Sequence, residues 1–399
     1  MQNRQTNQVF NFDEFPNFEK DIDLKQRAWI EVKGKAIEKN VRQLRSKLSK
    51  NCQFMAVVKA DGYGHDAKVV SEYAIKGGAS ELGVATLKEG IKLRSFGVKK
   101  PILILGNLYT KRDLIISFKN DLMPTISSIR ECLVCNNIGK HFGLKFSLHL
   151  KVDTGMSRLG FESDKFVEQF KKIKSFENIS IEGIYSHLSS ADEDKSYDPK
   201  STTQLQRKKF QELLKQINFD RNKDLNIHLA NSAGMLLNKD FHFHMVRVGL
   251  SMYGYSPLDK LDKNLVLKSA LFLKVKVAFI RTIDPGVGVS YGGKFISQRK
   301  TNLAVLSLGY ADGVPRNLSG KIKVIFKNKL YPQVGSRTMD QMMVDITGSS
   351  EIKVGSTMVL LGSDGDKTIS PLEWARKSNT IPWEILCSFK NRLPRVQVD

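Results

Sequence analysis

The sequence predicts an α/β protein in which an N-terminal (β/α)8 barrel of the TIM type precedes a C-terminal, mainly β domain. Eight short apolar runs typical of strands occur between residues 54 and 248, and the segments between them have helical periodicity. From about Ser256, strand-like runs separated by turn signals dominate. An open, doubly wound sheet is the alternative for the first part, but eight evenly sized units favour a closed barrel.

The N-terminal part begins with a polar stretch. Residues 1–26 are rich in Asn and Gln and lack periodicity, so we expect a loosely ordered tail. A short strand at Ala28–Val32 and a helix at about 35–48 follow, and the barrel is assigned residues 27–255. Its eight strands are expected at Phe54–Lys59, Leu82–Thr86, Pro101–Leu105, Met123–Ile126, Phe146–Val152, Ile179–His187, Leu225–Leu229 and Met245–Val248.

Two of the intervening helices have candidate N-caps. Ser163 precedes apolar residues at helical spacing (Phe166, Phe170), and Ser201 opens the segment that contains Leu205 and Leu213. The C-terminal domain is assigned residues 256–399. Its main strands are expected at Leu271–Ile280, Leu303–Leu308, Ile322–Phe326 and Thr357–Leu361.

Composition excludes several classes of protein. The 399 residues are 41% hydrophobic and 26% charged, which is ordinary for a globular protein and excludes overall disorder. No run approaches the roughly 20 apolar residues of a membrane span, and the first residues do not resemble a signal peptide. Four cysteines are too few for a disulfide framework. We therefore expect a cytoplasmic protein without membrane contact.

The net charge of +22 raises the question of a nucleic-acid partner. The basic clusters are short and scattered, and no aromatic residues interleave with them, so a lysine-rich solvated surface is the better interpretation.

No metal is expected either, because His187 has no second His or Cys at ligand spacing. Cys132 and Cys135 stand alone as a pair and are interpreted as packing residues.

Lys59 is the first candidate for chemistry, because active sites of such barrels lie at the C-terminal ends of the strands. It ends an apolar strand, and burial lowers the pKa of a lysine and frees its amine for Schiff-base formation. A lysine that extends to solvent is the equally plausible alternative for Lys59 alone. Gly62 and Gly64 on either side of Tyr63 favour the first interpretation, since they allow the backbone to approach a ligand.

A second group of candidates follows strands seven and eight. Ser232 and Gly249 lie where barrels often bind phosphate through backbone N–H groups and a hydroxyl. A Schiff-base lysine with a phosphate site is the pattern of pyridoxal phosphate. Arg247 is then the candidate partner of the pyridine nitrogen, with a salt bridge at the barrel mouth as its alternative role. His187 ends strand six and could equally be structural.

Together these residues closely resemble alanine racemases, which are pyridoxal-phosphate enzymes with a barrel and a β domain. The resemblance covers about Ala28 to Val396. Its most specific motifs are Ala56–His65 around the lysine and Lys151–Gly160. Further matches are Asn231-Ser232, Val246–Gly249, Val289–Gly292, Gly309–Gly313, Met339–Gln341 and Glu384–Cys387.

The resemblance implies a role for each matching residue. Lys59 would carry pyridoxal 5'-phosphate as a covalent Schiff base and act as one base, with Tyr291 as the second. Tyr63, Ser232, Gly249 and Leu250 would bind the phosphate, Arg247 the ring nitrogen, and Arg158 the phenolic oxygen and the substrate carboxylate. Tyr310 and the Met339 backbone would contact substrate. His187 and Arg247 are candidates for a relay that lowers the pKa of Tyr291.

The resemblance also implies an assembly and a biological role. The β domain would complete the partner's site in a head-to-tail homodimer, so that Tyr291, Tyr310 and Met339 act across the interface. The product D-alanine would supply peptidoglycan. Lys151 is similar to the lysine that some members carry as a carbamate.

Two features depart from the family pattern, and alternative functions remain open. Trp383 stands where many members have a tyrosine that reaches the phosphate, and Ser336-Arg337 follow Gly335 where a Gly-Arg pair is usual. A racemase for serine or another small amino acid shares nearly every motif. A decarboxylase of the same fold or a non-catalytic pyridoxal-phosphate carrier is disfavoured, by the Lys59 motif and by the full β domain with Tyr291 respectively.

Overall fold

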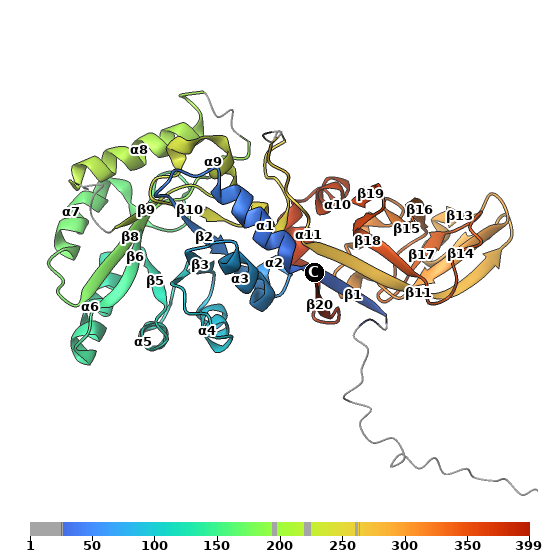
Figure 1. Cartoon of the computed structure of the whole chain (residues 1–399), viewed down its shortest axis with the longest axis horizontal. Coiled ribbons are helices and arrows are strands. Elements are labelled where there is room, and N and C mark those ends of the chain that lie inside the picture. Colours follow the sequence, from blue (N-terminus) through green and yellow to red (C-terminus); the bar gives the residue numbers. More distant parts are fainter. Residues whose placement is uncertain (1–24, 26, 194–197, 219–224, 260–261, 263) are drawn as a thin grey trace, which may run out of the picture.

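The computed structural model describes residues 25, 27–193, 198–218, 225–259, 262 and 264–399. The predicted tail therefore lies, except for Lys25, outside the described residues. The described chain forms two lobes, an N-terminal barrel and a C-terminal β domain (Figure 1). No helix among the described residues is long and apolar enough to cross a membrane.

The first lobe is the predicted closed barrel of eight parallel strands. Its sheet order is β5-β4-β3-β2-β10-β9-β8-β6, and a further pairing of β5 with β6 closes it. The strands are β2 (Gln53–Val57), β3 (Glu81–Val84), β4 (Ile102–Ile104), β5 (Met123–Ile126), β6 (Phe146–Asp153), β8 (Ile179–Tyr185), β9 (Asn226–His228) and β10 (Met245–Val248). A two-residue strand, β7 (Phe161–Glu162), extends the sheet beside β6. The barrel prediction is thus confirmed, and the open sheet is excluded.

Helices cover the outside of the barrel. They are α1 (Gly34–Arg45), α3 (Ala67–Lys76), α4 (Leu87–Ser95), α5 (Lys111–Lys119), α6 (Ile129–Phe142), α7 (Ser163–Ile173), α8 (Thr202–Gln216) and α9 (Ser232–Leu237), with the short α2 (Lys59–Tyr63) at the end of β2. Ser201 caps α8 as predicted, accepting from the backbone of Gln204. The predicted cap Ser163 is wrong: it is the first residue inside α7, and its hydroxyl donates to the Asp153 carbonyl instead.

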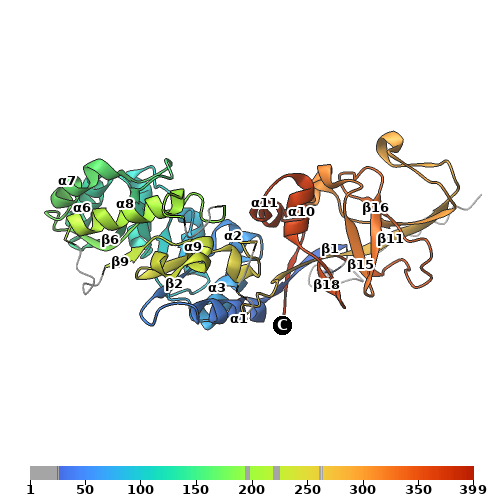
Figure 2. The ribbon, with the colours of Figure 1, turned by 90° about the horizontal axis from the view of Figure 1, so that it is seen from above.

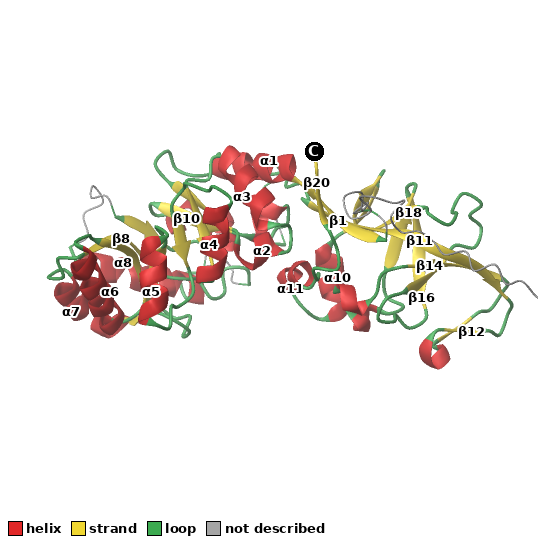
Figure 3. Ribbon diagram, turned by 90° about the horizontal axis from the view of Figure 1, so that it is seen from below, coloured by secondary structure: helices red, strands yellow, loops and turns green. Residues whose placement is uncertain are grey.

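The second lobe is built on a nine-stranded sheet of order β19-β18-β15-β16-β17-β14-β11-β1-β20. Its strands are β11 (Leu271–Ile283), β14 (Thr301–Leu306), β15 (Lys323–Phe326), β16 (Lys329–Val334), β17 (Met342–Asp345), β18 (Thr357–Asp364), β19 (Lys367–Ile369) and β20 (Arg395–Val398). The short pair β12 (Gly288–Val289) and β13 (Phe295–Ile296) lies beyond β11, and α10 (Pro371–Ser378) and α11 (Pro382–Cys387) complete the lobe (Figure 3).

The first strand of the chain belongs to the second lobe. β1 (Ala28–Lys33) pairs antiparallel with β11 and parallel with β20. Both ends of the described chain therefore meet in one sheet, between the barrel and the rest of the β domain (Figure 2).

Helix α11 of the second lobe packs against the turn that follows β2 of the barrel. A Cβ on Gly64 would lie 2.4 Å from the Leu386 carbonyl oxygen, so glycine is needed where α11 passes the end of α2. The Arg395 guanidinium also donates to the Gly64 carbonyl at 3.2 Å. The turn after β2 is thus held in place by contacts from α11 and from Arg395 of β20.

Candidate active site

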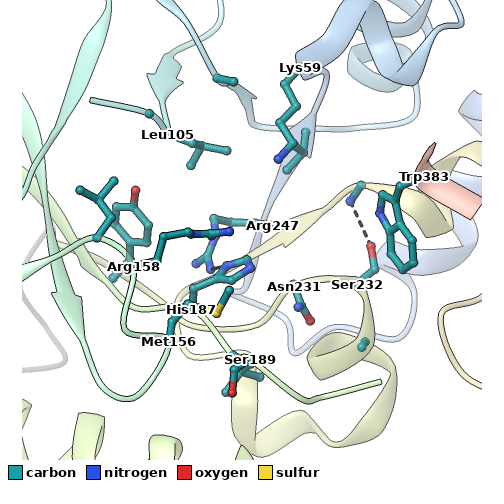
Figure 4. Close-up of a pocket in the computed structure, with 18 of the residues that line it drawn as sticks. Lys59, Leu105, Met156, Arg158, His187, Ser189, Asn231, Ser232, Arg247 and Trp383 are labelled. Carbon is teal, nitrogen blue, oxygen red and sulfur yellow. Dashed lines mark hydrogen bonds between the residues drawn. The ribbon is translucent and has the colours of Figure 1, made fainter. Parts of the chain in front are cut away.

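A cavity of about 870 Å3 opens at the C-terminal ends of the barrel strands (Figure 4). Seven of the residues predicted from the sequence line it: Lys59, Tyr63, Arg158, His187, Ser232, Arg247 and Gly249. Arg247 lies in β10, and the other six lie in the segments that follow β2, β6, β8, β9 and β10. Segments far apart in the chain therefore place one amine, two guanidinium groups and several hydroxyl groups around one space.

Lys59 is presented by an unusual turn. Ala60, Asp61, Gly62 and Tyr63 have φ between 52° and 63°, a run of left-handed residues that costs L-residues roughly 1–2 kcal/mol each. The Glu89 carboxylate holds the turn, accepting from the backbone N–H groups of Ala60 and Ala85, both at 2.7 Å. Such strain persists where the surroundings over-determine it, typically at functional sites.

The same turn gives Lys59 an environment that favours the neutral amine. Burial lowers the pKa of Lys59, and the nearby Arg158 charge lowers it further. A neutral amine can act as a nucleophile or accept a proton.

Tyr63, Ser232 and Gly249 form a small polar cradle in the cavity lining. The Ser232 hydroxyl accepts from the Gly249 N–H at 3.0 Å, and a Cβ on Gly249 would lie 2.5 Å from the Tyr63 hydroxyl oxygen. Tyr63 stacks on Tyr253 with 4.8 Å between ring centroids. The predicted Leu250 is buried next to Gly249 and does not itself line the cavity. Hydroxyl groups and close backbone with no carboxylate suit a phosphate group.

Arg247 is buried at the cavity wall, and both terminal nitrogens of its guanidinium make hydrogen bonds. Its Nη1 donates to His228 Nδ1 at 3.0 Å, and its Nη2 contacts His187 Nδ1 at 3.0 Å and the Ser186 and Leu229 carbonyls. Burial lowers the pKa of Arg247 to about 10, so the group stays charged near neutrality. Burial and the Arg247 charge hold the pKa of His187 well below its usual value, so His187 is a neutral imidazole.

Lys151 lies beside this group at 5% exposure. Burial, with the charges of Arg247 and Arg158, lowers its pKa to about 8. The Tyr185 ring lies 5.6 Å from its ammonium nitrogen and 5.0 Å from the Arg247 guanidinium. The Asp153 carboxylate shapes the adjoining loop by accepting from the Gly155, Met156 and Arg158 N–H groups, and so positions Arg158.

Tyr291, Tyr310 and Met339 do not line this cavity. They form a second group on the β domain, where the Ser336 hydroxyl donates to the Tyr291 carbonyl at 2.7 Å and Ala311 N–H to the Met339 carbonyl at 3.0 Å. Their side chains are exposed, Tyr291 at 72%. The departure at Ser336-Arg337 has a structural role, because the Arg337 guanidinium is buried and donates to the Pro315 carbonyl at 2.6 Å.

Several functional neighbours were missed from the sequence, notably Glu89, Tyr185 and His228. His228 and Tyr185 were inside predicted strands. Side chains of a strand point alternately inward and outward, and Lys151 on β6 and Arg247 on β10 are examples of inward positions. Applied to every strand, that alternation would have found them. Trp383, from α11, lines the cavity near Ser232 (Figure 4). Among the described residues, no group of His, Cys, Asp or Glu could hold a metal ion.

The chain matches two family models, "Alanine racemase, N-terminal domain" over residues 32–257 and "Alanine racemase, C-terminal domain" over 270–397. It is 51% identical over 377 residues to an alanine racemase of Prochlorococcus marinus, covering 94% of this chain and 97% of the relative. A solved alanine racemase of Clostridium difficile matches with TM-score 0.86 and 32% identity, covering 93% and 96%. An alanine racemase of Bartonella henselae "with covalently bound pyridoxal phosphate" matches with TM-score 0.82 and 29% identity, covering 93% and 99%.

Proposed function

This chain belongs to the alanine racemase family and is an amino-acid racemase, and on that premise we propose that it interconverts L-alanine and D-alanine by a two-base mechanism with pyridoxal 5'-phosphate. The observation that supports this most directly is that one cavity holds an amine of lowered pKa (Lys59), a phosphate cradle and a buried arginine. The D-alanine that it forms would be used for peptidoglycan.

The residues present fit the cofactor. Lys59 would hold it covalently, Tyr63, Ser232, Gly249 and the Leu250 backbone would bind the phosphate, Arg247 the ring nitrogen and Arg158 the phenolic oxygen. When bound, the cofactor draws electrons from the substrate's Cα and so makes its C–H bond acidic. The cradle supports this assignment, because it offers donors and no carboxylate to an anion.

The two bases would work on opposite faces of the substrate. Lys59 is suited to one face, since its lowered pKa lets the free amine accept a proton. Tyr291 would serve the other face. Arg247 can only donate, so the neutral His187 accepts at Nδ1 and carries its proton on Nε2. That N–H could donate to the Tyr291 oxygen and stabilise it when it has lost its proton.

A head-to-tail homodimer explains where Tyr291 comes from. Tyr291, Tyr310 and Met339 are grouped and exposed, yet they do not line the cavity of their own chain. In the dimer they would close the partner's cavity, with Tyr310 and the Met339 backbone on the substrate and Arg158 on its carboxylate.

The test is proton exchange with chiral analysis. Purified protein with pyridoxal phosphate is given L-alanine in D2O, loss of the Cα–H signal is followed by NMR, and the same sample is analysed for D-alanine. Exchange with accumulation of D-alanine is expected. Exchange without D-alanine would leave only one working base and contradict the role of Tyr291. A parallel run with L-serine tests the second candidate, which Trp383 at the cavity wall keeps open.

A further inference from the structure

The hydrogen bonds of Arg247 continue inward into the barrel. His228 accepts from Arg247 through Nδ1, and its other nitrogen, Nε2, lies 3.0 Å from His149 Nδ1. Both imidazoles are fully buried. Arg247, His228 and His149 therefore form one line from the floor of the cavity to the barrel interior.

Elementary donor and acceptor rules fix the protons along this line. A guanidinium has only donors, so His228 Nδ1 must accept and carries no proton. Burial and the Arg247 charge keep the pKa of His228 well below its usual value, so the ring is neutral and its single proton is on Nε2. That N–H points at His149, whose Nδ1 must in turn accept.

The surroundings are shaped for this arrangement. Tyr185 stacks on His228 with 4.6 Å between centroids and 11° between planes, which fixes the ring's orientation. A Cβ on Gly183 would lie 2.5 Å from His149 Nδ1, so only glycine on β8 leaves room for the second imidazole. His149 Nε2 is buried and has no hydrogen-bond partner among the described residues, so the Nδ1 contact to His228 is the ring's one directed interaction.

We propose that His149 is a positioning residue, which accepts the Nε2–H of His228 and thereby holds His228 in the tautomer whose Nδ1 can receive Arg247. Without an acceptor at His149, the Nε2–H of His228 is buried without a partner, and only the Arg247 guanidinium still favours that tautomer. The alternative tautomer has an N–H facing the guanidinium, which removes one of its hydrogen bonds and lets it shift. The effect on racemisation rests on the proposed function, whereas the tautomers themselves do not.

The first test is made on the wild-type protein. 15N NMR of the holoenzyme labelled at histidine, with signals assigned from single substitutions, reads the tautomer of each ring. The proposal requires a proton on Nε2 of both His228 and His149. A proton on Nδ1 of either ring would overturn it, whatever the enzyme's activity.

Variants then test the positioning role. His149→Leu removes the acceptor, and we expect a mixed or reversed His228 tautomer with kcat lowered about tenfold and KM nearly unchanged, the fold-change of one buried hydrogen bond to a charged network. His149→Asn places an amide oxygen where Nδ1 lies, and should restore both the His228 tautomer and the wild-type kcat. Another buried histidine, His242, is the control, because its Nε2 bonds the Met235 carbonyl. His242→Leu should lower stability and leave His228 unchanged.

Three results would contradict the positioning role. They are an unchanged His228 tautomer in His149→Leu, an unchanged kcat in that variant, or an Asn variant no better than the Leu variant. If His149→Leu does not fold, the wild-type spectrum and the Asn variant still decide. Absence of racemisation by the wild type would instead contradict the proposed function and leave the tautomer result standing.

Discussion

At the scale of single residues, Lys151 is a side chain whose surroundings oppose its ordinary charge. Its pKa is lowered from 10.5 to about 8, first by burial and then by two arginines. The unfolded chain therefore binds more protons between about pH 8 and 10.5, and stability rises with pH over that window. Below pH 8 the buried ammonium costs roughly 3 kcal/mol, from about 1.4 kcal/mol per pKa unit.

Lys151→Met should therefore raise the free energy of unfolding at pH 7 by on the order of 2–3 kcal/mol, and the gain should vanish towards pH 10.5. Urea unfolding at several pH values measures this. In bicarbonate, CO2 can add to the neutral amine with loss of a proton, and the resulting carbamate would stabilise the wild type through Arg158 and Arg247. The exposed Lys88 provides the control Lys88→Met, which should change little. A gain at pH 10 as large as at pH 7 would contradict the argument.

Trp383 carries a second prediction at this scale. The indole ring is larger than phenol, and its one donor, the Nε1–H, lies at a different place on the ring from a tyrosine hydroxyl. Trp383→Tyr should tighten pyridoxal phosphate binding about tenfold if the hydroxyl reaches the phosphate, since a hydrogen bond to a charged group is worth roughly 1.5–3 kcal/mol. Equilibrium dialysis measures the affinity. Trp383→Phe has the same ring without the hydroxyl and should not show the gain; equal affinities for both variants would exclude the contact.

At the scale of elements, the left-handed turn α2 positions Lys59 at the cavity. Gly62 has φ +63°, and a Cβ there would lie 2.7 Å from Val70 on α3. Gly62→Ala combines a backbone cost of about 1 kcal/mol with overpacking of about 1–3 kcal/mol, so we expect a loss of roughly 2–4 kcal/mol of stability and a fall in kcat as Lys59 moves.

Gly97 provides the matched control for this substitution. It has φ +82°, and a Cβ there would meet nothing within 4 Å, so Gly97→Ala isolates the backbone cost. It should lose only about 1 kcal/mol in chemical unfolding and keep its kcat. Equal losses in the two variants would mean that packing against α3 does not hold the turn.

Elements also show how far sequence alone reaches. All eight barrel strands were predicted, because buried parallel strands are short apolar runs between helical segments. The pairing of β1 with β11 and β20 was not, since contacts between the two ends of a chain leave no local pattern. The cavity residues Lys59, Ser232 and Arg247 followed from strand ends and motifs. Glu89 was missed because a helix-capping glutamate looks ordinary until the structure shows it holding Ala60.

At the scale of the whole molecule, the two groups of predicted site residues lie on different lobes. The cavity belongs to the barrel, and Tyr291 with its neighbours belongs to an exposed region of the β domain. A monomer would have one base at the cavity and the other in solvent. The proposed head-to-tail dimer accounts for both observations, because the β domain of each subunit would bring its tyrosine to the partner's cavity.

Complementation between inactive subunits tests this arrangement. Lys59→Ala and Tyr291→Phe should each abolish most racemisation. When the two are co-expressed with different tags, half of random dimers are mixed, and each mixed dimer has one site with both bases intact. About a quarter of all sites, and hence about a quarter of wild-type activity, should return, rising to about half in purified mixed dimers. Bases that act within one chain cannot be restored by mixing, so mixed dimers without activity would place Tyr291 outside the partner's site.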